Sequence, residues 1–169
     1  SPQTEIPINE RLRELLKTNR QEIAALKISE EIARGKFGEM EPEEALKTAI
    51  RVGLAVVTEG VTVAPIQGLS DVQIRENKDG TKYACLFFAG PMRSAGGTES
   101  GFTVVLADHV RKTMNLSTYQ PYSMGDDEPE RILEELRMYE RYQSFQFKVS
   151  DESLLQTCRR LPVEVNGVD

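Results

Sequence analysis

The sequence has almost none of the residues on which metal sites and nucleophilic catalysis usually depend. Its 169 residues include one histidine, two cysteines and no tryptophan. The single histidine, His109, removes most zinc sites and histidine-based catalytic triads from consideration. Cys85 and Cys158 both fall in apolar patterns, as small core residues do. The sequence therefore predicts no disulfide framework, no metal site and no catalytic residue in this chain.

An excess of positive charge and long apolar runs are also missing. The 21 lysines and arginines are outnumbered by 27 acidic residues, which gives a net charge of −6 and a pI of about 5.0. Because phosphate binding needs clustered basic side chains, any contact with DNA must use a local patch. No apolar stretch approaches the roughly 20 residues of a membrane helix, and no signal peptide is recognisable. We therefore expect a cytoplasmic protein with no membrane partner.

Length and composition indicate one domain of ordinary size. The 169 residues are 39% hydrophobic, and the apolar residues come in periodic blocks. The chain begins with Ser1-Pro2 rather than methionine, so we expect a piece of a longer protein, although a processed protein would begin in the same way. We predict an N-terminal helical arm over residues 1–40 and a single α+β accessory domain over residues 41–169.

Two helices are predicted in the arm. Asn9 can cap a short helix whose leucines either form a docking stripe or fold back on the domain. Asn19 followed by Glu22 has the spacing of a capping box. It predicts a second helix over residues 21–34, ended by Gly35. The leucines of the first helix are Leu12, Leu15 and Leu16.

A third helix should begin at Pro42, which suits the first helical position, and end at Gly60. Its apolar residues recur with the 3.6-residue period of a helix buried on one face. We expect further helices over residues 98–114, 127–142 and 150–160. The apolar stripe of the third helix consists of Ala45, Leu46, Ala49, Ile50, Gly53, Leu54 and Val57.

Strand patterns occupy the middle and the end of the chain. Residues 69–76 alternate, and residues 83–89 are apolar on both faces, which is typical of a central strand. Residues 78–81 carry a hairpin turn signal between them, and residues 161–165 predict a last short strand. Without regular βαβ alternation, the sequence predicts an α+β fold: a small, mostly antiparallel sheet packed with several helices.

The segment most able to bind a ligand is a glycine-rich turn, residues 90–97, between a strand and a helix. The N–H groups at a helix start can hold an anion, and Arg93 can add a bidentate contact to phosphate. Two neighbouring hydroxyl side chains supply hydrogen-bond donors, and two glycines let the backbone come close to a ligand. Two basic residues farther along the helix could extend the basic surface. The predicted phosphate- or nucleic-acid-binding residues are Arg93, Ser94, Gly96, Gly97, Thr98, Arg111 and Lys112.

The same turn has a structural interpretation. Its spacing fits neither a Walker A loop nor a dinucleotide fingerprint. Glycines at this place also permit tight packing of the strand against the helix. Physical reasoning alone therefore leaves both interpretations open.

As a whole string the segment is more specific. Residues 88–98, FAGPMRSAGGT, followed by VVLADHVRK at 104–112, resemble the N-terminal region of the large subunit of the archaeal D-family DNA polymerase, also called DNA polymerase II. Residues 22–38, 49–77 and 159–167 are similar to the same region. The resemblance weakens over residues 117–150.

The resemblance implies a heterodimeric, DNA-directed DNA polymerase that acts in replication. Its large subunit extends DNA with divalent metal ions such as Mg²⁺, and its small subunit is a 3′→5′ exonuclease. The polymerase aspartates of that family lie downstream of the region matched here, so the fragment itself needs no cofactor. The implied partners are DNA, the small subunit and the remainder of the large subunit, and self-association of the chain stays open.

Three hypotheses follow. The chain is an accessory domain that helps to position DNA, or an interaction module that binds other parts of the polymerase without touching DNA. A free-standing phosphate-binding enzyme is the third hypothesis, and the absence of a base, a nucleophile or a metal cluster disfavours it.

Overall fold

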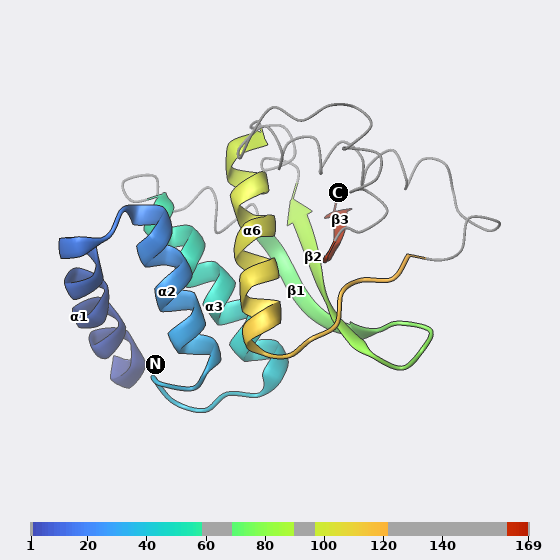
Figure 1. Ribbon diagram of the computed structural model, residues 1–169, viewed down its shortest axis with the longest axis horizontal. Helices are drawn as coiled ribbons and strands as arrows, with labels where there is room; N and C mark the ends of the chain where they lie inside the picture. The colour runs from blue at the N-terminus through green and yellow to red at the C-terminus, as the bar shows by residue number, and fades with distance from the viewer. Residues whose placement is uncertain (1, 59–68, 90–96, 122–161, 169) are drawn as a thin grey trace.

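In the computed structural model α3 and α6 lie against one face of a small sheet, α2 packs on both of these helices, and α1 packs outside α2 (Figure 1). The structure describes residues 2–58, 69–89, 97–121 and 162–168. The fold is α+β, as the sequence predicted. The elements in chain order are α1 (Pro2–Thr18), α2 (Gln21–Ala33), α3 (Pro42–Val57), β1 (Leu69–Glu76), β2 (Lys82–Ala89), α6 (Gly97–Thr113) and β3 (Glu164–Val168).

The sheet has the strand order β1-β2-β3, and β2 is its central strand as predicted. β1 and β2 form an antiparallel hairpin, with Val72 opposite Leu86. The turn closes through a hydrogen bond from the Asn77 N–H to the Thr81 carbonyl, 2.8 Å long. Gly80 adopts a φ of 87°, a conformation that glycine reaches without strain.

The prediction that the sheet is mostly antiparallel is wrong, because β3 pairs with β2 in parallel and the sheet is mixed. Cys85 lies opposite Glu164 in this pairing. A parallel neighbour requires a long crossover connection, and α6 supplies the described part of it. The last strand also begins three residues later than predicted, at Glu164.

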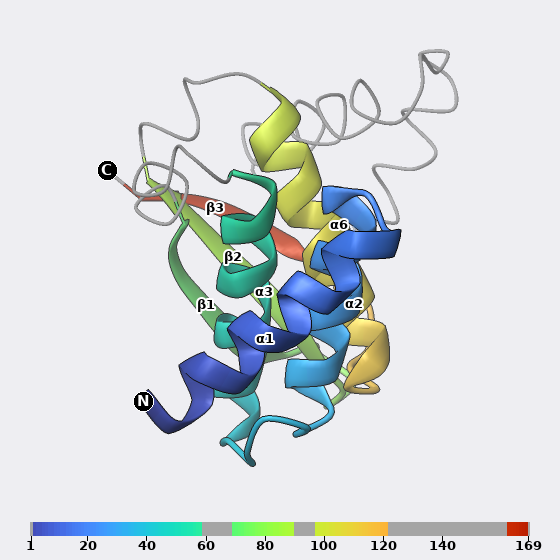
Figure 2. The same cartoon turned by 90° about the vertical axis from the view of Figure 1, so that its left-hand side faces the viewer.

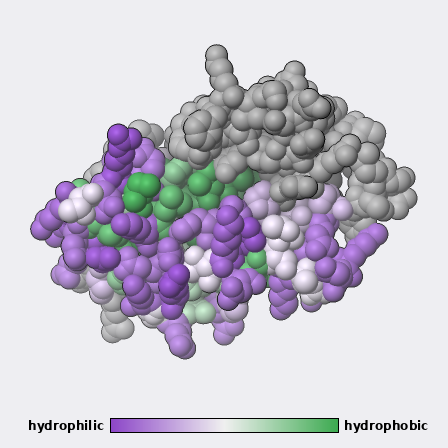
Figure 3. Space-filling view, in the orientation of Figure 1, coloured by the Kyte–Doolittle hydropathy of each residue, from purple (hydrophilic) through white to green (hydrophobic). Residues whose placement is uncertain are grey.

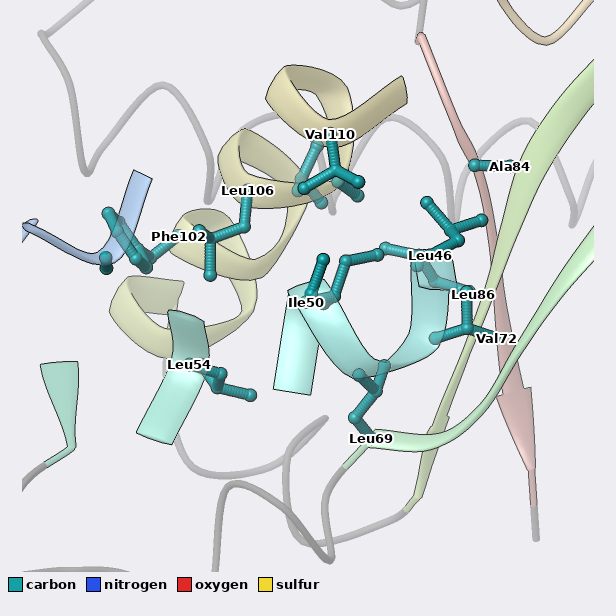
Figure 4. Packing of buried hydrophobic residues seen from close by; sticks show 14 of the residues in the cluster. Leu46, Ile50, Leu54, Leu69, Val72, Ala84, Leu86, Phe102, Leu106 and Val110 are labelled. Carbon is teal, nitrogen blue, oxygen red and sulfur yellow. The ribbon is translucent and has the colours of Figure 1, made fainter. Parts of the chain in front are cut away.

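α3 carries the central row of the core. Its predicted apolar stripe is confirmed, with Leu46, Ile50 and Leu54 fully buried. Figure 4 shows these side chains between those of α6 and those of the sheet. The facing residues in this cluster are Phe102, Leu106 and Val110 of α6, and Leu69, Val72, Ala84 and Leu86 of the hairpin.

The predicted caps of the first two helices are wrong. Asn9 lies inside α1, which already begins at Pro2. The Asn19 side chain donates backwards to the Leu15 carbonyl, 2.8 Å away, so it satisfies the end of α1. Arg20 occupies the N-cap position of α2 without a side-chain hydrogen bond. Gly35, with a φ of 83°, follows the end of α2 as predicted.

α1 and α2 both contribute to the packing of the domain. The Arg11 Nε atom lies 3.0 Å from Glu31 Oε1 and joins the two helices. Ile28 and Ile32 of α2 are buried in the same core as α3 and α6. The division of the chain at residue 40 stays a prediction. The predicted helices over residues 127–142 and 150–160, the predicted end at Gly60, and Cys158 lie outside the described residues.

Candidate nucleic-acid interface

The glycine-rich turn joins the central strand of the sheet to α6. β2 ends at Ala89 and α6 begins at Gly97. The two views of the molecule place the end of β2 and the start of α6 at the same end of the domain (Figures 1 and 2). Gly97 and Thr98 belong to the first turn of α6, whereas Arg93, Ser94 and Gly96 lie outside the described residues.

The core fixes α6 in place. Phe102, Leu106 and Val110 are buried along one side of this 17-residue helix, against α2, α3 and the sheet. The first turn of a helix has N–H groups with no partner in the helix and a partial positive charge. The fold therefore holds this N-terminus at a defined position.

The two basic residues predicted to extend the site lie at the other end of α6. Arg111 is 9% exposed. Its Nε and Nη2 atoms lie 2.9 and 2.6 Å from Asp108 Oδ1, and Nη1 donates to the Leu116 carbonyl. The Lys112 side chain is 65% exposed, with Nζ 3.3 Å from Asp108 Oδ2. Through its bond to the Leu116 carbonyl, the guanidinium group of Arg111 thus holds the segment that follows α6 in place.

Helix length keeps the two ends apart. At 1.5 Å per residue, Arg111 lies about 20 Å along the axis from Gly97. The turn and the basic pair therefore cannot bind the same phosphate. That either of them contacts DNA stays a prediction.

A buried polar cluster on the sheet face turned away from the helices was not predicted. Glu164 of β3 is 3% exposed, and Glu164 Oε1 accepts a 2.6 Å hydrogen bond from the Tyr83 hydroxyl. The Asn166 amide donates to Glu164 Oε2. Burial, together with the bond to Glu164, raises the pKa of Tyr83. The cluster therefore ties the last strand to the central one.

The sequence feature that could have predicted this cluster is that alternate residues of β2 point to opposite faces of the sheet. Tyr83, Cys85 and Phe87 share the face that does not join the main core. Tyr119 packs on Tyr83 with ring centroids 5.0 Å apart. Tyr119 is itself buried, so its ring serves the packing of this cluster.

The other groups able to do chemistry have structural roles among the described residues. Burial raises the pKa of Cys85 to about 12, so its thiol stays protonated at neutral pH and is a poor nucleophile. The His109 Nε2 atom lies 3.1 Å from Glu30 Oε2 and joins α6 to α2. Within the described ranges, no three histidine, cysteine or acidic side chains come close enough to share a metal ion.

The surface around α6 is mixed in character. On the face in Figure 3, hydrophilic side chains cover most of the described surface, and apolar ones gather over the upper parts of α2 and α6. Ile23 of α2 is 43% exposed, and Leu26 and Val105 are partly exposed. Among the described helices, none is both long enough and apolar enough to cross a bilayer.

Comparison with known proteins decides the family. Residues 3–169 match the family described as DNA polymerase II large subunit DP2, N-terminal. The chain belongs to this family. It is 54% identical over 160 residues to the DNA polymerase II large subunit of Cenarchaeum symbiosum, 44% over 161 residues to that of Methanococcus vannielii, and 38% over 164 residues to that of Thermococcus kodakarensis.

These matches define which part of the polymerase the chain represents. They cover 94–95% of this chain but only 9–14% of the length of the three relatives. The resemblance found in the glycine-rich turn is therefore confirmed for the family. The chain corresponds to the N-terminal region of the DNA polymerase II large subunit.

Proposed function

We propose that this chain is a non-catalytic accessory domain of the large subunit of a replicative DNA polymerase, and that it helps to position DNA. The observation that carries the proposal is the junction between β2 and α6. There the buried central strand ends at Ala89, and α6, a helix held by the core, begins at Gly97. Arg93 and the N–H groups of the glycine-rich turn bind a phosphate of the DNA backbone.

The chemistry of the polymerase belongs to other parts of the assembly in this proposal. The remainder of the large subunit extends the DNA strand with Mg²⁺. The small subunit carries the 3′→5′ exonuclease, and the complex works in the cytoplasm. Two-metal catalysis needs several carboxylates converging on ions about 4 Å apart, and the described residues bring together no such group. In this proposal, the contribution of this chain is to hold the DNA backbone rather than to cut or join it.

The first prediction tests the phosphate contact. In the assembled polymerase, Arg93→Ala should weaken binding to primed DNA and slow extension, because one charge-assisted contact to phosphate is lost. The plot of log affinity against log salt concentration should become shallower by about one unit, as expected for one lost phosphate contact. Equilibrium DNA binding at several salt concentrations measures this change.

Two control variants separate this contact from a loss of general charge. Arg93→Lys keeps the charge and should keep most of the salt dependence. Arg13→Ala removes an exposed arginine from α1 and should leave both affinity and extension unchanged. If Arg93→Ala has the salt dependence and the extension rate of the parent, the chain does not hold DNA through this turn.

That result would favour the second candidate function, a protein interaction module. One observation supports it: an apolar groove of about 380 Å³ lies between α1 and α3. It would receive apolar side chains of the rest of the large subunit or of the small subunit. The residues lining the groove are Ile8, Asn9, Leu12, Leu16, Val52, Ala55 and Val56.

A further inference from the structure

The outer edge of the sheet at β1 has backbone groups that β2 does not use. Among the strands that the structure describes, β1 is an end strand in the order β1-β2-β3. Val72 and Ile74 are two residues apart, so their N–H and C=O groups point to the same side, away from β2. The Ser70 carbonyl also faces away from β2, next to an irregularity in the register between Leu69 and Asp71. An open edge of this kind is a template for pairing with another extended chain.

α3 places a row of charged side chains along this edge. Glu43, Lys47 and Arg51 follow one another at four-residue intervals, so they share one face of the helix. Glu43 Oε2 accepts the Ile74 backbone N–H at 3.0 Å. Arg51 Nη2 donates to the Ser70 carbonyl at 3.5 Å, the longest of these contacts.

Lys47, the middle residue of the row, contacts β1 through the side chain of Asp71. Lys47 Nζ lies 2.8 Å from Asp71 Oδ1, and the Asp71 carboxylate also accepts the backbone N–H of Val72. The bond to Lys47, followed by the bond to Gln73, lowers the pKa of Asp71 to about 2. From Ser70 to Ile74, each outward-facing position of β1 is therefore contacted by a charged side chain that α3 supplies or holds.

We propose that Glu43, Lys47 and Arg51 form an edge guard that closes β1 to strand pairing, and that the segment it excludes is β1 of a second copy of this chain. Two identical antiparallel edges can pair about a two-fold axis, so the partner strand is always available. β1 is eight residues long, enough for a full strand. Pairing would require displacing Glu43 from the Ile74 N–H and burying the charges of Lys47 and Asp71, which is unfavourable.

The test replaces the edge guard in the full-length large subunit. In Glu43→Ala/Lys47→Ala/Arg51→Ala, the Ile74 amide should exchange with solvent roughly tenfold faster in dilute solution, because a hydrogen bond to a charged acceptor is lost. At higher concentration the variant should self-associate, and exchange over residues 69–76 should slow again. Sedimentation over a concentration series and hydrogen exchange read by mass spectrometry measure the two effects.

A matched control removes the same charges elsewhere. Glu10→Ala/Arg13→Ala/Lys17→Ala also deletes one acidic and two basic side chains, all exposed on α1, and should behave as the parent. The proposal is overturned if the edge-guard variant associates no more than the parent, or if it associates without protecting residues 69–76.

A single substitution keeps the test decisive if the triple variant does not fold. Glu43→Ala removes one exposed side chain and leaves the core intact. It should speed exchange at Ile74, whereas Glu43→Gln, which keeps an acceptor oxygen, should restore most of the protection. Parent-like exchange at Ile74 in Glu43→Ala would overturn the proposal.

Discussion

Gly53 of α3 lies where α2 and α6 both approach this helix closely. A Cβ atom at this position would collide with Ser29 Oγ of α2 and would lie 2.7 Å from Leu106 Cδ2 of α6. Ser29 has little freedom to move, because its buried hydroxyl donates to the Ala49 carbonyl at 2.8 Å. The close contact between α2, α3 and α6 therefore requires a residue without a side chain at position 53.

We expect Gly53→Ala to lower the free energy of unfolding by about 1–2 kcal/mol, because overpacking outweighs the higher helix propensity of alanine. Urea denaturation of the variant and the parent measures the difference. In the double variant with Ser29→Ala, the loss should be smaller than the sum of the two single losses. A more stable Gly53→Ala protein would show that α2 and α6 can move to make room for the methyl group without loss of stability.

At the scale of single residues, the sequence predicted which residues are buried better than it predicted which residues they contact. Helical periodicity placed Gly53 in the apolar stripe but gave no distance to Ser29, which lies on another helix. Arg111 was predicted to extend a phosphate site, and the structure directs its guanidinium group to Asp108 and Leu116. The i,i+3 spacing of Asp108 and Arg111 was the available signal for that local ion pair.

α3 shows how one element can serve two surfaces. Its apolar stripe faces α6 and the sheet, while its charged row reaches the edge of β1. The ion pair between Lys47 and Asp71 is the part of this row that responds to acid. Asp71 titrates lower in the folded protein, at about 2, than in an unfolded chain, where aspartate titrates near 4.

A group with a lowered folded pKa stabilises the protein above its unfolded pKa and loses this effect as the pH falls. We therefore expect the parent to be more stable than Lys47→Gln at pH 6, by less than about 1 kcal/mol because the pair is partly exposed. The difference should shrink between about pH 4 and pH 2. Urea midpoints across this range measure it, with Lys17→Gln on α1 as the control. A difference independent of pH would contradict the ion pair.

Elements defined by local signals were predicted well, and those defined by distant partners were not. Pro42 and the apolar stripe fixed α3, and the turn after Asn77 fixed the hairpin. The direction of β3 depends on the crossover that precedes it, which no periodicity within the strand reveals. Asn19 failed as a cap for a similar reason, because the end of one helix and the start of the next competed for its side chain.

On the scale of the whole molecule, the candidate interface and the overall charge oppose each other. The chain carries a net charge of −6, while the proposed contact with DNA uses one turn at one end of the domain. Long-range repulsion between this chain and DNA weakens any local attraction at low salt.

We expect the isolated chain to bind duplex DNA weakly at physiological salt, with a dissociation constant no tighter than the roughly 10⁻⁴–10⁻⁶ M of non-specific binding. Fluorescence anisotropy with a labelled duplex measures this affinity. The assembled polymerase serves as the comparison. Nanomolar binding by the isolated chain would show that the charge balance is a poor guide to this surface.

The late position of β3 in the chain has a consequence for how the protein is made. Tyr83 and Glu164, which join β2 to β3, are 81 positions apart in the sequence. During synthesis, the helices and the hairpin emerge first and can collapse on one another, since their contacts are closer in sequence. Until residues 164–168 leave the ribosome, the flank of β2 that will receive β3 has no partner strand. The nascent chain is therefore most open to mispairing at β2, on the opposite side of the hairpin from the edge guard.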